Sequence, residues 1–503
     1  MDYVKTSDAW ITSNNAAGLS NLSVESISDA GVFFKKGNGK FANYYQSDNY
    51  YTLGAQTESY YRFDNDIVFY GKVGYDSFKG KNMAGSVFMD PYNTPFDIVE
   101  YTENTAGEKK LETYHLIGAV SVDITGKFTI GGKIDYKAAN YSKHKDLRHK
   151  NSLMDMSLSL GGRYNISAGM GFGANFFYRR STEGLIFDTY GNKADQYISL
   201  VSYGAFYGKT ELFESKGYTS KGEDTPLFNE YIGGSFQVDL EISEGLRLFN
   251  ELTYKSRTGY YGKRSPSTVV YAEHDGSILE YHGVISLRKQ KNLHALSVNV
   301  SNEELKNYEN VYRHEVAPGG NQVVMYYGNT EMLKRSIFSV VADYTANLGI
   351  SNNTPSWVMK AGADYSSRNQ TVSIYPYYRK QTINQYSAYT SACKNIVKGT
   401  NIYSLSLGLL YGAGGGTDKD DGIYNNSSAT TSPASMNNML YKEFEYLTAS
   451  RIAGDVGIGY SRPINENIKG YAILNYNLTN AFDISYNAGK TFNLINIKIG
   501  CTF

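Results

Sequence analysis

Charged side chains recur at alternate positions in many segments of this sequence, with apolar side chains between them. Between residues 127 and 141, for example, Lys133 and Asp135 alternate with Ile134 and Tyr136. Residues at alternate positions of a strand share a face, so such a segment has one charged and one apolar face. Charged groups lie in hydrocarbon only at high cost, whereas they suit a water-filled channel, where rings of one sign select ions.

The candidate channel-lining residues include both signs of charge. They are Glu58, Arg62, Lys133, Asp135, Arg163, Asp239, Glu241, Arg247, Asp343, Arg451 and Asp455. This mixture of signs predicts no clear ion preference. It fits a passage for solutes, and it equally fits an internal network of ion pairs that rigidifies or closes the channel.

No spacing in the sequence specifies a catalytic, cofactor-binding or metal site. His115 lies on a polar strand face with Asp123, but no nucleophile accompanies them at a defined spacing. The segment Asp418-Lys419-Asp420-Asp421-Gly422 alternates carboxylates, yet a calcium loop also needs a later glutamate ligand, which favours an ordinary turn. We therefore expect no enzyme, no cofactor and no metal.

The charged faces belong to predicted β-strands, because a period of two recurs along nearly the whole chain. The candidate strands are residues 22–36, 41–63, 66–79, 110–124, 127–141, 151–165, 167–181, 229–242, 246–260, 277–288, 292–303, 332–349, 355–367, 371–385, 397–411, 448–462, 466–478 and 490–503. The number is eighteen, or sixteen without the first segment and the one that contains Pro376, since proline cannot donate to a ladder. Such lengths suit a bilayer, which ~9–11 tilted strand residues cross.

Connections between these segments alternate between short and long. The long ones are residues 81–109, 183–228, 259–276, 303–331 and 413–447, and the last is rich in Gly, Ser and Asn and predicts a mobile loop. Short turns at one rim and long loops at the other are typical of outer-membrane barrels. We predict an all-β fold: a transmembrane, antiparallel, up-and-down barrel of 16–18 strands over residues 22–503, with short periplasmic turns and long extracellular loops. Residues 1–21 form an N-terminal leader or small hatch.

Composition excludes several other classes of protein. Among 503 residues, 49 Lys and Arg balance 49 Asp and Glu, which argues against a partner nucleic acid. The mean hydropathy is −0.42, and no apolar run approaches the ~18 residues of a spanning helix. Two cysteines, Cys393 and Cys501, make no disulfide framework. The first thirty residues show no secretory signal, so we expect a mature exported chain whose signal has been removed.

The last segment contains the most specific local motif. Ile497, Ile499 and Phe503 alternate with polar residues and end in an aromatic ring. This pattern resembles the terminal assembly signal of Gram-negative outer-membrane β-barrel proteins, which implies recognition by the barrel-assembly machinery. With 47 tyrosines, the chain resembles the large porin-like barrels of Bacteroidota outer membranes, several of which accompany TonB-dependent uptake systems. The resemblance implies an outer-membrane location, among membrane lipid and lipopolysaccharide.

The N-terminal stretch gives a second resemblance. Asn15-Ala16-Ala17-Gly18-Leu19 resembles the Asn-Pro-Ala-Gly-Leu stretch of FadL-like barrels, with Ala16 in place of the proline. That resemblance implies a hatch, an apolar pocket beside the N-terminal segment and a lateral gap, for the import of hydrophobic compounds. The plug domain of TonB-dependent transporters does not fit, because only residues 1–21 precede the first predicted strand.

Together these patterns predict an outer-membrane passage protein, either porin-like or a substrate-uptake channel with passive transport. The alternative is a closed barrel that acts as an interaction partner. It would be an accessory subunit of a TonB-dependent uptake complex or the partner of a surface lipoprotein. It would dock through residues 183–228 and 413–447. Conduction separates the two hypotheses, because an interaction partner needs no open channel.

Overall fold

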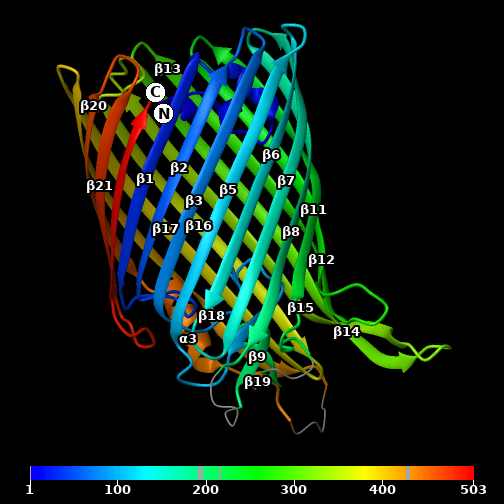
Figure 1. Cartoon of the computed structure of the whole chain (residues 1–503). Coiled ribbons are helices and arrows are strands. Elements are labelled where there is room, and N and C mark those ends of the chain that lie inside the picture. The colour runs from blue at the N-terminus through cyan, green and yellow to red at the C-terminus, as the bar shows by residue number, and fades with distance from the viewer. Residues whose placement is uncertain (1, 191–195, 214–216, 426–430) are drawn as a thin grey trace.

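Eighteen strands of the chain close into one antiparallel barrel in the computed structural model, which describes residues 2–190, 196–213, 217–425 and 431–503 (Figure 1). The strands are β1 (Ser26–Gly39), β2 (Asn49–Arg62), β3 (Ile67–Met83), β5 (Gly107–Asp123), β6 (Phe128–Lys143), β7 (Arg148–Ser167), β8 (Met170–Asp188), β11 (Thr225–Ser243), β12 (Leu246–Gly262), β13 (Val270–Lys289), β14 (Asn292–Val316), β15 (Gln322–Leu348), β16 (Trp357–Ile374), β17 (Tyr377–Lys398), β18 (Asn401–Ile423), β20 (Arg451–Pro463), β21 (Lys469–Ala481) and β22 (Thr491–Thr502). Each strand pairs with the next around the barrel, and β22 pairs with β1. The predicted fold class is confirmed, at the upper end of the predicted strand number.

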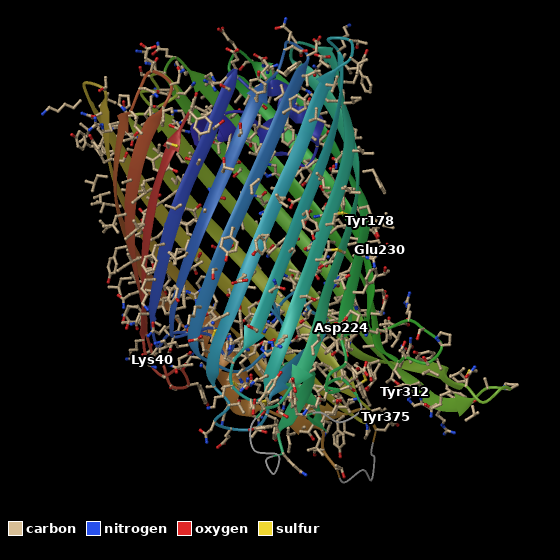
Figure 2. All side chains as sticks on the ribbon, in the orientation of Figure 1. Lys40, Tyr178, Asp224, Glu230, Tyr312 and Tyr375 are labelled. Carbon is tan, nitrogen blue, oxygen red and sulfur yellow. The ribbon has the colours of Figure 1, made fainter. Side chains whose placement is uncertain are left out.

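The period of two gives the barrel an apolar outer face and a polar inner face. On β6, Ile130 and Ile134 are exposed on the outside, while Lys133 and Asp135 line a cavity on the inside. An apolar outer belt is what hydrocarbon requires of a membrane barrel. Glu230, a carboxylate on the outer face, has a partner: the hydroxyl of Tyr178 donates to it at 2.8 Å (Figure 2).

The two rims differ in the length of their connections. At one rim the turns are short, such as residues 168–169 between β7 and β8 and residues 399–400 between β17 and β18. Both chain ends lie at this rim, at the top of Figure 1. By the rule for outer-membrane barrels it is the periplasmic rim, and the opposite rim is extracellular.

At the extracellular rim, long connections fold back into the barrel mouth. They form a small sheet of β4 (Asp97–Glu100), β9 (Ile198–Gly204), β10 (Tyr207–Leu212) and β19 (Ala434–Ser435), together with the helix α3 (Asn437–Thr448). Val201 and Tyr203 of β9 are fully buried in one cluster with Leu333 and Val372 of the barrel wall. Their apolar side chains gain by leaving water, which explains why these connections lie inside. We call residues 84–106, 197–213 and 434–448 the extracellular cap.

The N-terminal segment, residues 2–22, lies inside the barrel near the periplasmic rim. It consists of α1 (Asp2–Thr6), α2 (Ala9–Thr12) and the 3-10 helix η1 (Ala16–Asn21). Leu19 and Leu22 pack against Tyr60 of β2 in a buried cluster. The wall is glycine where the segment approaches most closely, because a Cβ on Gly131 would lie 2.2 Å from the amide nitrogen of Ala17. Among the described helices, none is long and apolar enough to cross a membrane.

Two predicted strand boundaries were wrong near the N-terminus and near Pro376. The predicted strand 41–63 begins only at Asn49, after a loop. The predicted strand 371–385 instead spans a tight turn, because β16 ends at Ile374 and β17 begins at Tyr377. Proline lacks the amide that a ladder needs, which places it in the turn rather than in a strand.

Two of the predicted long loops are largely regular structure. Residues 303–331 form a hairpin, because β14 and β15 continue past the rim and project from the barrel (Figure 1). Within 413–447, residues 413–423 extend β18 and residues 437–448 form α3, while residues 426–430 lie outside the described part. Outside the bilayer a strand no longer needs an apolar face, so the period of two fades where the strands continue.

Candidate functional site

Two cavities lie inside the barrel, and the N-terminal segment borders both. The first cavity, of about 510 Å³, is enclosed by β5 to β8 and β11 to β14, with Asn14 of the N-terminal segment and Asn93 of the extracellular cap. The second cavity, of about 630 Å³, lies between Tyr3 and Thr6 of the N-terminal segment and the wall strands β13 to β20. These enclosed, partly polar spaces are the candidate binding sites of the molecule.

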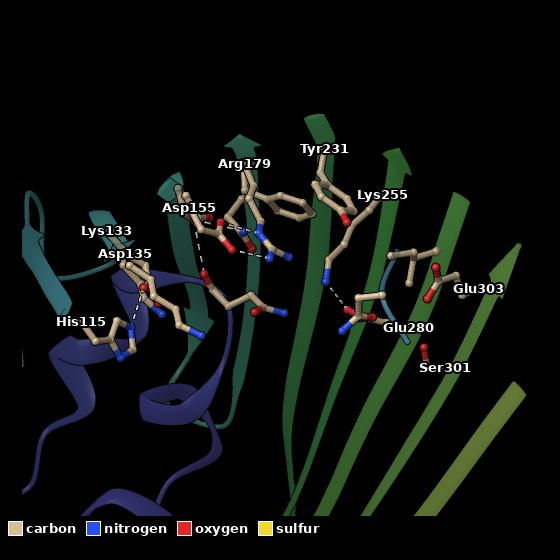
Figure 3. Close-up of a pocket in the computed structure, with 18 residues that line it drawn as sticks. His115, Lys133, Asp135, Asp155, Arg179, Tyr231, Lys255, Glu280, Ser301 and Glu303 are labelled. Atoms are coloured by element: carbon tan, nitrogen blue, oxygen red, sulfur yellow. Dashed lines mark hydrogen bonds and ion pairs between the residues drawn. The ribbon is translucent and has the colours of Figure 1, made fainter. Parts of the chain in front are cut away.

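The first cavity is lined by ion pairs that link neighbouring strands (Figure 3). The guanidinium of Arg179 donates two hydrogen bonds to Asp155, at 2.8 and 2.6 Å. Nε2 of His115 lies 2.8 Å from Oδ1 of Asp135. A third pair joins Lys255 to Glu280 at 2.6 Å, and Glu303 accepts from Arg257 at 3.0 Å. Each carboxylate of this cavity is therefore matched by a basic side chain.

The second cavity is lined mainly by small polar side chains. They are Thr6, Ser7, Thr12, Ser286, Ser297, Thr345, Asn347, Asn353, Thr354, Ser391, Asn395 and Ser406. Asp343 and Asp455 also border it, together with Lys360. Apolar side chains such as Val284, Val358 and Leu407 complete this mixed lining, so the apolar pocket expected beside the N-terminal segment stays a prediction. The expected lateral gap is wrong for the described wall, since every barrel strand pairs with a neighbour on each side.

Trp10 anchors the N-terminal segment to the wall. Its side chain is 1% exposed, and its indole Nε1 donates to Asp239 at 3.0 Å. The ring also meets Phe249 edge to face, at 5.2 Å between centroids, and the guanidinium of Arg163 stacks 4.6 Å from its centre. Burial, a charge-assisted hydrogen bond and a cation–π contact therefore act on one side chain.

Five of the predicted channel-lining residues hold the N-terminal segment in place. Arg163 and Asp239 contact Trp10, as described, and Arg163 also donates to Asn21. Arg62 donates to the carbonyl oxygens of Ser20 at 2.9 Å and Leu22 at 2.7 Å. Glu58 pairs with Lys5, and Arg247 pairs with Asp8 at 3.4 Å. Their charges thus bind another part of the same chain.

The other predicted residues fall into four places. Lys133 and Asp135 border the first cavity, and Asp343 and Asp455 border the second. Arg451 lies near the extracellular rim and donates to the carbonyl oxygen of Tyr446 in α3, at 2.9 Å. Glu241 is exposed near the periplasmic rim, so the structure does not bring it together with the rest.

The extracellular cap contains a buried carboxylate, Asp97 of β4. It accepts hydrogen bonds from the hydroxyls of Ser86 at 2.6 Å and Tyr44 at 3.0 Å. Burial raises the pKa of Asp97 to about 7, although those two hydroxyls and the charge of Lys109 act in the opposite direction. The protonation of this group therefore changes close to neutral pH.

Sequence reasoning missed the cap, and it left open whether residues 1–21 form a leader or a small hatch. For the cap there was a signal, because the run from Ile198 to Tyr207 is apolar although it lies inside a predicted loop. For the N-terminal segment the signals were the stretch from Asn15 to Leu19 and Trp10, one of two tryptophans. The partner of Trp10, Asp239, is 229 positions away, and the alternation of residues within one strand says nothing about contacts at that separation.

The described residues contain no group of three or more His, Cys, Asp or Glu placed to hold a metal ion. In the acidic stretch that begins at Asp418, the carboxylate of Asp421 binds Arg379 in two hydrogen bonds, at 2.6 and 2.8 Å. Arg379 also donates to the cap, at the carbonyl oxygen of Ala205. Asp421 therefore holds Arg379 in the position from which Arg379 joins the wall to the cap. Cys393 and Cys501 are both free thiols.

The chain belongs to a protein family described as a family of unknown function (DUF6850), whose model matches residues 16–503. No curated protein matches the sequence.

Several solved outer-membrane proteins are similar in structure at very low sequence identity. The ferric preacinetobactin receptor BauA of Acinetobacter baumannii is 9% identical, with a TM-score of 0.40, over 95% of this chain and 79% of that one. The ferric-catecholate import receptor Fiu of E. coli K12 is 8% identical, with a TM-score of 0.38, over 94% and 82%. A mutant of the monoaromatic hydrocarbon channel TodX is 12% identical, with a TM-score of 0.31, over 98% and 93%.

Proposed function

We propose that this member of a family of unknown function is a gated outer-membrane channel for the passive uptake of small polar solutes. The observation behind the proposal is the arrangement of the lumen. Two cavities of about 510 and 630 Å³ lie inside an eighteen-stranded barrel, beside segments of the chain that occupy its two ends. A barrel of this size is wide enough for an aqueous path once such segments move.

The N-terminal segment is the gate that we propose on the periplasmic side. It is joined to the barrel only through β1, and polar contacts such as Arg247 with Asp8 and Arg62 with Ser20 hold it to the wall. Water can replace polar contacts of this kind at modest cost, because the net free energy of each is small. The buried Trp10 adds a larger cost, so the segment leaves the lumen only in brief openings, while the barrel strands stay paired. The extracellular cap closes the other end.

The polarity of the lumen favours hydrophilic solutes over hydrophobic compounds. Ion pairs line the first cavity, and serine, threonine and asparagine side chains line much of the second. An apolar solute would have to displace water from these groups without replacing its hydrogen bonds, which is costly. A hydroxyl-rich solute can replace those hydrogen bonds directly.

A reversible disulfide tests whether the N-terminal segment gates the channel. Nδ2 of Asn14 lies 3.5 Å from Oγ1 of Thr253 on β12, so we choose N14C/T253C in a C393S/C501S background to lock the segment to the wall. Loss of free thiols on oxidation verifies that the disulfide forms. In planar bilayers we expect brief single-channel openings under reducing conditions and their loss on oxidation. The single variant N14C should conduct under both conditions.

Two results would contradict this proposal. Equal currents in the oxidised and reduced double variant would mean that ions bypass the N-terminal segment. The second is the absence of current under both conditions, from a barrel that still migrates as a folded species on unheated gels. It would mean that the lumen stays closed, and the interaction hypothesis would remain.

The projecting hairpin of β14 and β15 favours that second candidate function, an accessory subunit of an uptake complex or surface lipoprotein. Beyond Leu333, where the pairing of β15 with β16 begins, the hairpin exposes Val311, Met325 and Tyr327. Strands with an unpaired edge and exposed apolar side chains recruit partner chains. The segments predicted to dock, by contrast, supply the inward-folded cap.

Co-purification from native membranes tests this second function. Replacing residues 311–328 by an Asn-Gly turn shortens the hairpin, because Asn310 pairs with Asn329 in the register. We expect a partner at fixed stoichiometry to be lost from this variant and kept by K263Q, because Lys263 is exposed in the loop between β12 and β13, outside the hairpin. A solitary barrel in both preparations would exclude the interaction function.

A further inference from the structure

The charges that line the first cavity are unequally matched. Its four carboxylates, Asp135, Asp155, Glu280 and Glu303, all have basic partners within hydrogen-bonding distance. The ammonium groups of Lys133 and Lys137 border the same space. Among the described residues, neither forms an ion pair or hydrogen bond. Without counting the imidazole of His115, five basic groups (Lys133, Lys137, Arg179, Lys255 and Arg257, which pairs with Glu303) face four carboxylates, so the net charge around this cavity is positive.

The two lysines lie on one face of β6, with Asp135 between them. In the register with β7, Lys133 stands opposite Ser159 and Lys137 stands opposite Asp155. Asp155 is already bound by both hydrogen bonds of Arg179, and Asp135 is bound by His115. Neither ammonium group forms a hydrogen bond with a carboxylate in the described part of the chain, so both remain available to a solute.

We propose that the first cavity binds a small anionic solute rich in hydroxyl groups, with Lys133 and Lys137 holding its acidic group. This assignment rests on the proposed uptake function and names its substrate class. Serine and asparagine side chains of the same cavity, such as Ser157, Ser301 and Asn93, supply partners for hydroxyl groups. An ammonium group acts as a compact point charge and attracts carboxylate and phosphate alike. A sugar acid and a sugar phosphate therefore share the required chemistry.

The size of the cavity limits the solute. A volume of about 510 Å³ falls in the range of small-molecule sites and takes a ligand of the size of one or two sugar rings. Aromatic stacking contributes little, because Arg179 and Arg257 already lie over the ring of Tyr231, at 4.9 and 5.5 Å. Recognition therefore depends on charge and hydrogen bonds.

Calorimetric titration of the full chain in detergent tests this site with glucuronate, glucose 6-phosphate and glucose. We expect both anions to bind and glucose to bind at least about tenfold more weakly, since a charge-assisted hydrogen bond contributes roughly 1.5–3 kcal/mol. The variant K133Q/K137Q should lose about tenfold in affinity for the anions, and K133R/K137R should retain most of it. K398Q is the matched control, because Lys398 is exposed and borders neither cavity.

The outcomes separate this inference from the proposed function. Equal affinities of glucuronate and glucose, or unchanged glucuronate binding by a folded K133Q/K137Q variant, would overturn the anion site while solute uptake could still stand. If glucose 6-phosphate binds more tightly than glucuronate, the solute class is sugar phosphates. If glucuronate binds more tightly, the solute class is sugar acids. Anion binding that needs the two lysines, in a barrel that never conducts, supports the site and contradicts uptake.

Discussion

At the scale of single residues, the charged side chains inside this barrel mainly hold the N-terminal segment against the wall. Arg163 and Asp239 meet at Trp10, and Arg62 holds the two carbonyl oxygens at the end of the N-terminal segment. Of the two interpretations that the mixed charges allowed, these contacts match a network that closes the lumen. The two unpaired lysines of the first cavity are the exception, which is why we assign them to a solute.

Trp10→Ala should release the N-terminal segment without unfolding the barrel. Removing a large buried aromatic costs about 3–5 kcal/mol, and it also leaves Asp239 without its indole donor. We expect protease to cut the segment about a hundredfold faster in the folded protein, since ~1.4 kcal/mol corresponds to tenfold. Trp10→Phe keeps the ring and should lie between the two. Equal cleavage of all three proteins would show that Trp10 does not hold the segment.

At the scale of elements, loops and terminal helices occupy the two ends of the barrel. The cap brings its own small sheet, whose apolar face packs on the barrel wall near Leu333. Its α3 helix is tied to the loop at the extracellular rim, because the carboxylate of Glu445 accepts from the amides of Tyr486 and Asn487. Burial opposes this arrangement, but those amides keep the pKa of Glu445 below its usual value. The cap is thus built to stay folded as a unit.

The buried Asp97 should make the docking of the cap depend on pH. The docked cap binds this proton more tightly than a released cap does, since the pKa is about 7 when buried and about 4 in water. Docking is therefore strongest in acid, weakens as pH rises from about 4 to about 7, and stays weaker above that. We expect proteolysis of the cap to be on the order of 50- to 100-fold slower at pH 5 than at pH 8.

Asp97→Asn is the control for this effect, because an amide mimics the protonated carboxyl at every pH. The variant should show slow proteolysis throughout, with little difference between pH 5 and pH 8. A variant that keeps the full pH dependence would assign it to another group. The buried hydroxyls of Ser86 and Tyr44 can still bond the amide, so the cap should fold normally.

At the scale of the whole molecule, the barrel is closed by the seam between β1 and β22. The last residue contributes directly, because the backbone of Phe503 exchanges two hydrogen bonds with Ser28, at 2.7 and 3.0 Å. Its ring is exposed on the outer face, as are the aliphatic side chains of Ile497 and Ile499. An aromatic at this rim suits the membrane interface. The assembly role predicted for these three residues stays a prediction.

Deletion of Phe503 tests that role at the same scale. We expect the yield of the heat-modifiable, folded species in the outer membrane to fall severalfold, while the stability of barrels that do form changes by only about 1–2 kcal/mol, the worth of two backbone hydrogen bonds. Phe503→Tyr keeps the aromatic ring and should assemble normally. An unchanged yield after deletion would contradict an assembly signal at this terminus.

The sequence by itself determined the barrel and the direction in which each strand faces. Alternation is a local property, so residues such as Ile134 and Asp135 on β6 reveal their faces without any knowledge of distant neighbours. Only the tertiary structure decided what fills the barrel. Contacts such as Asn14 with Glu251, which are 237 positions apart, join segments that no period links. The pairing that left Lys133 and Lys137 free likewise depends on which strands close around them, and that is a property of the assembled wall.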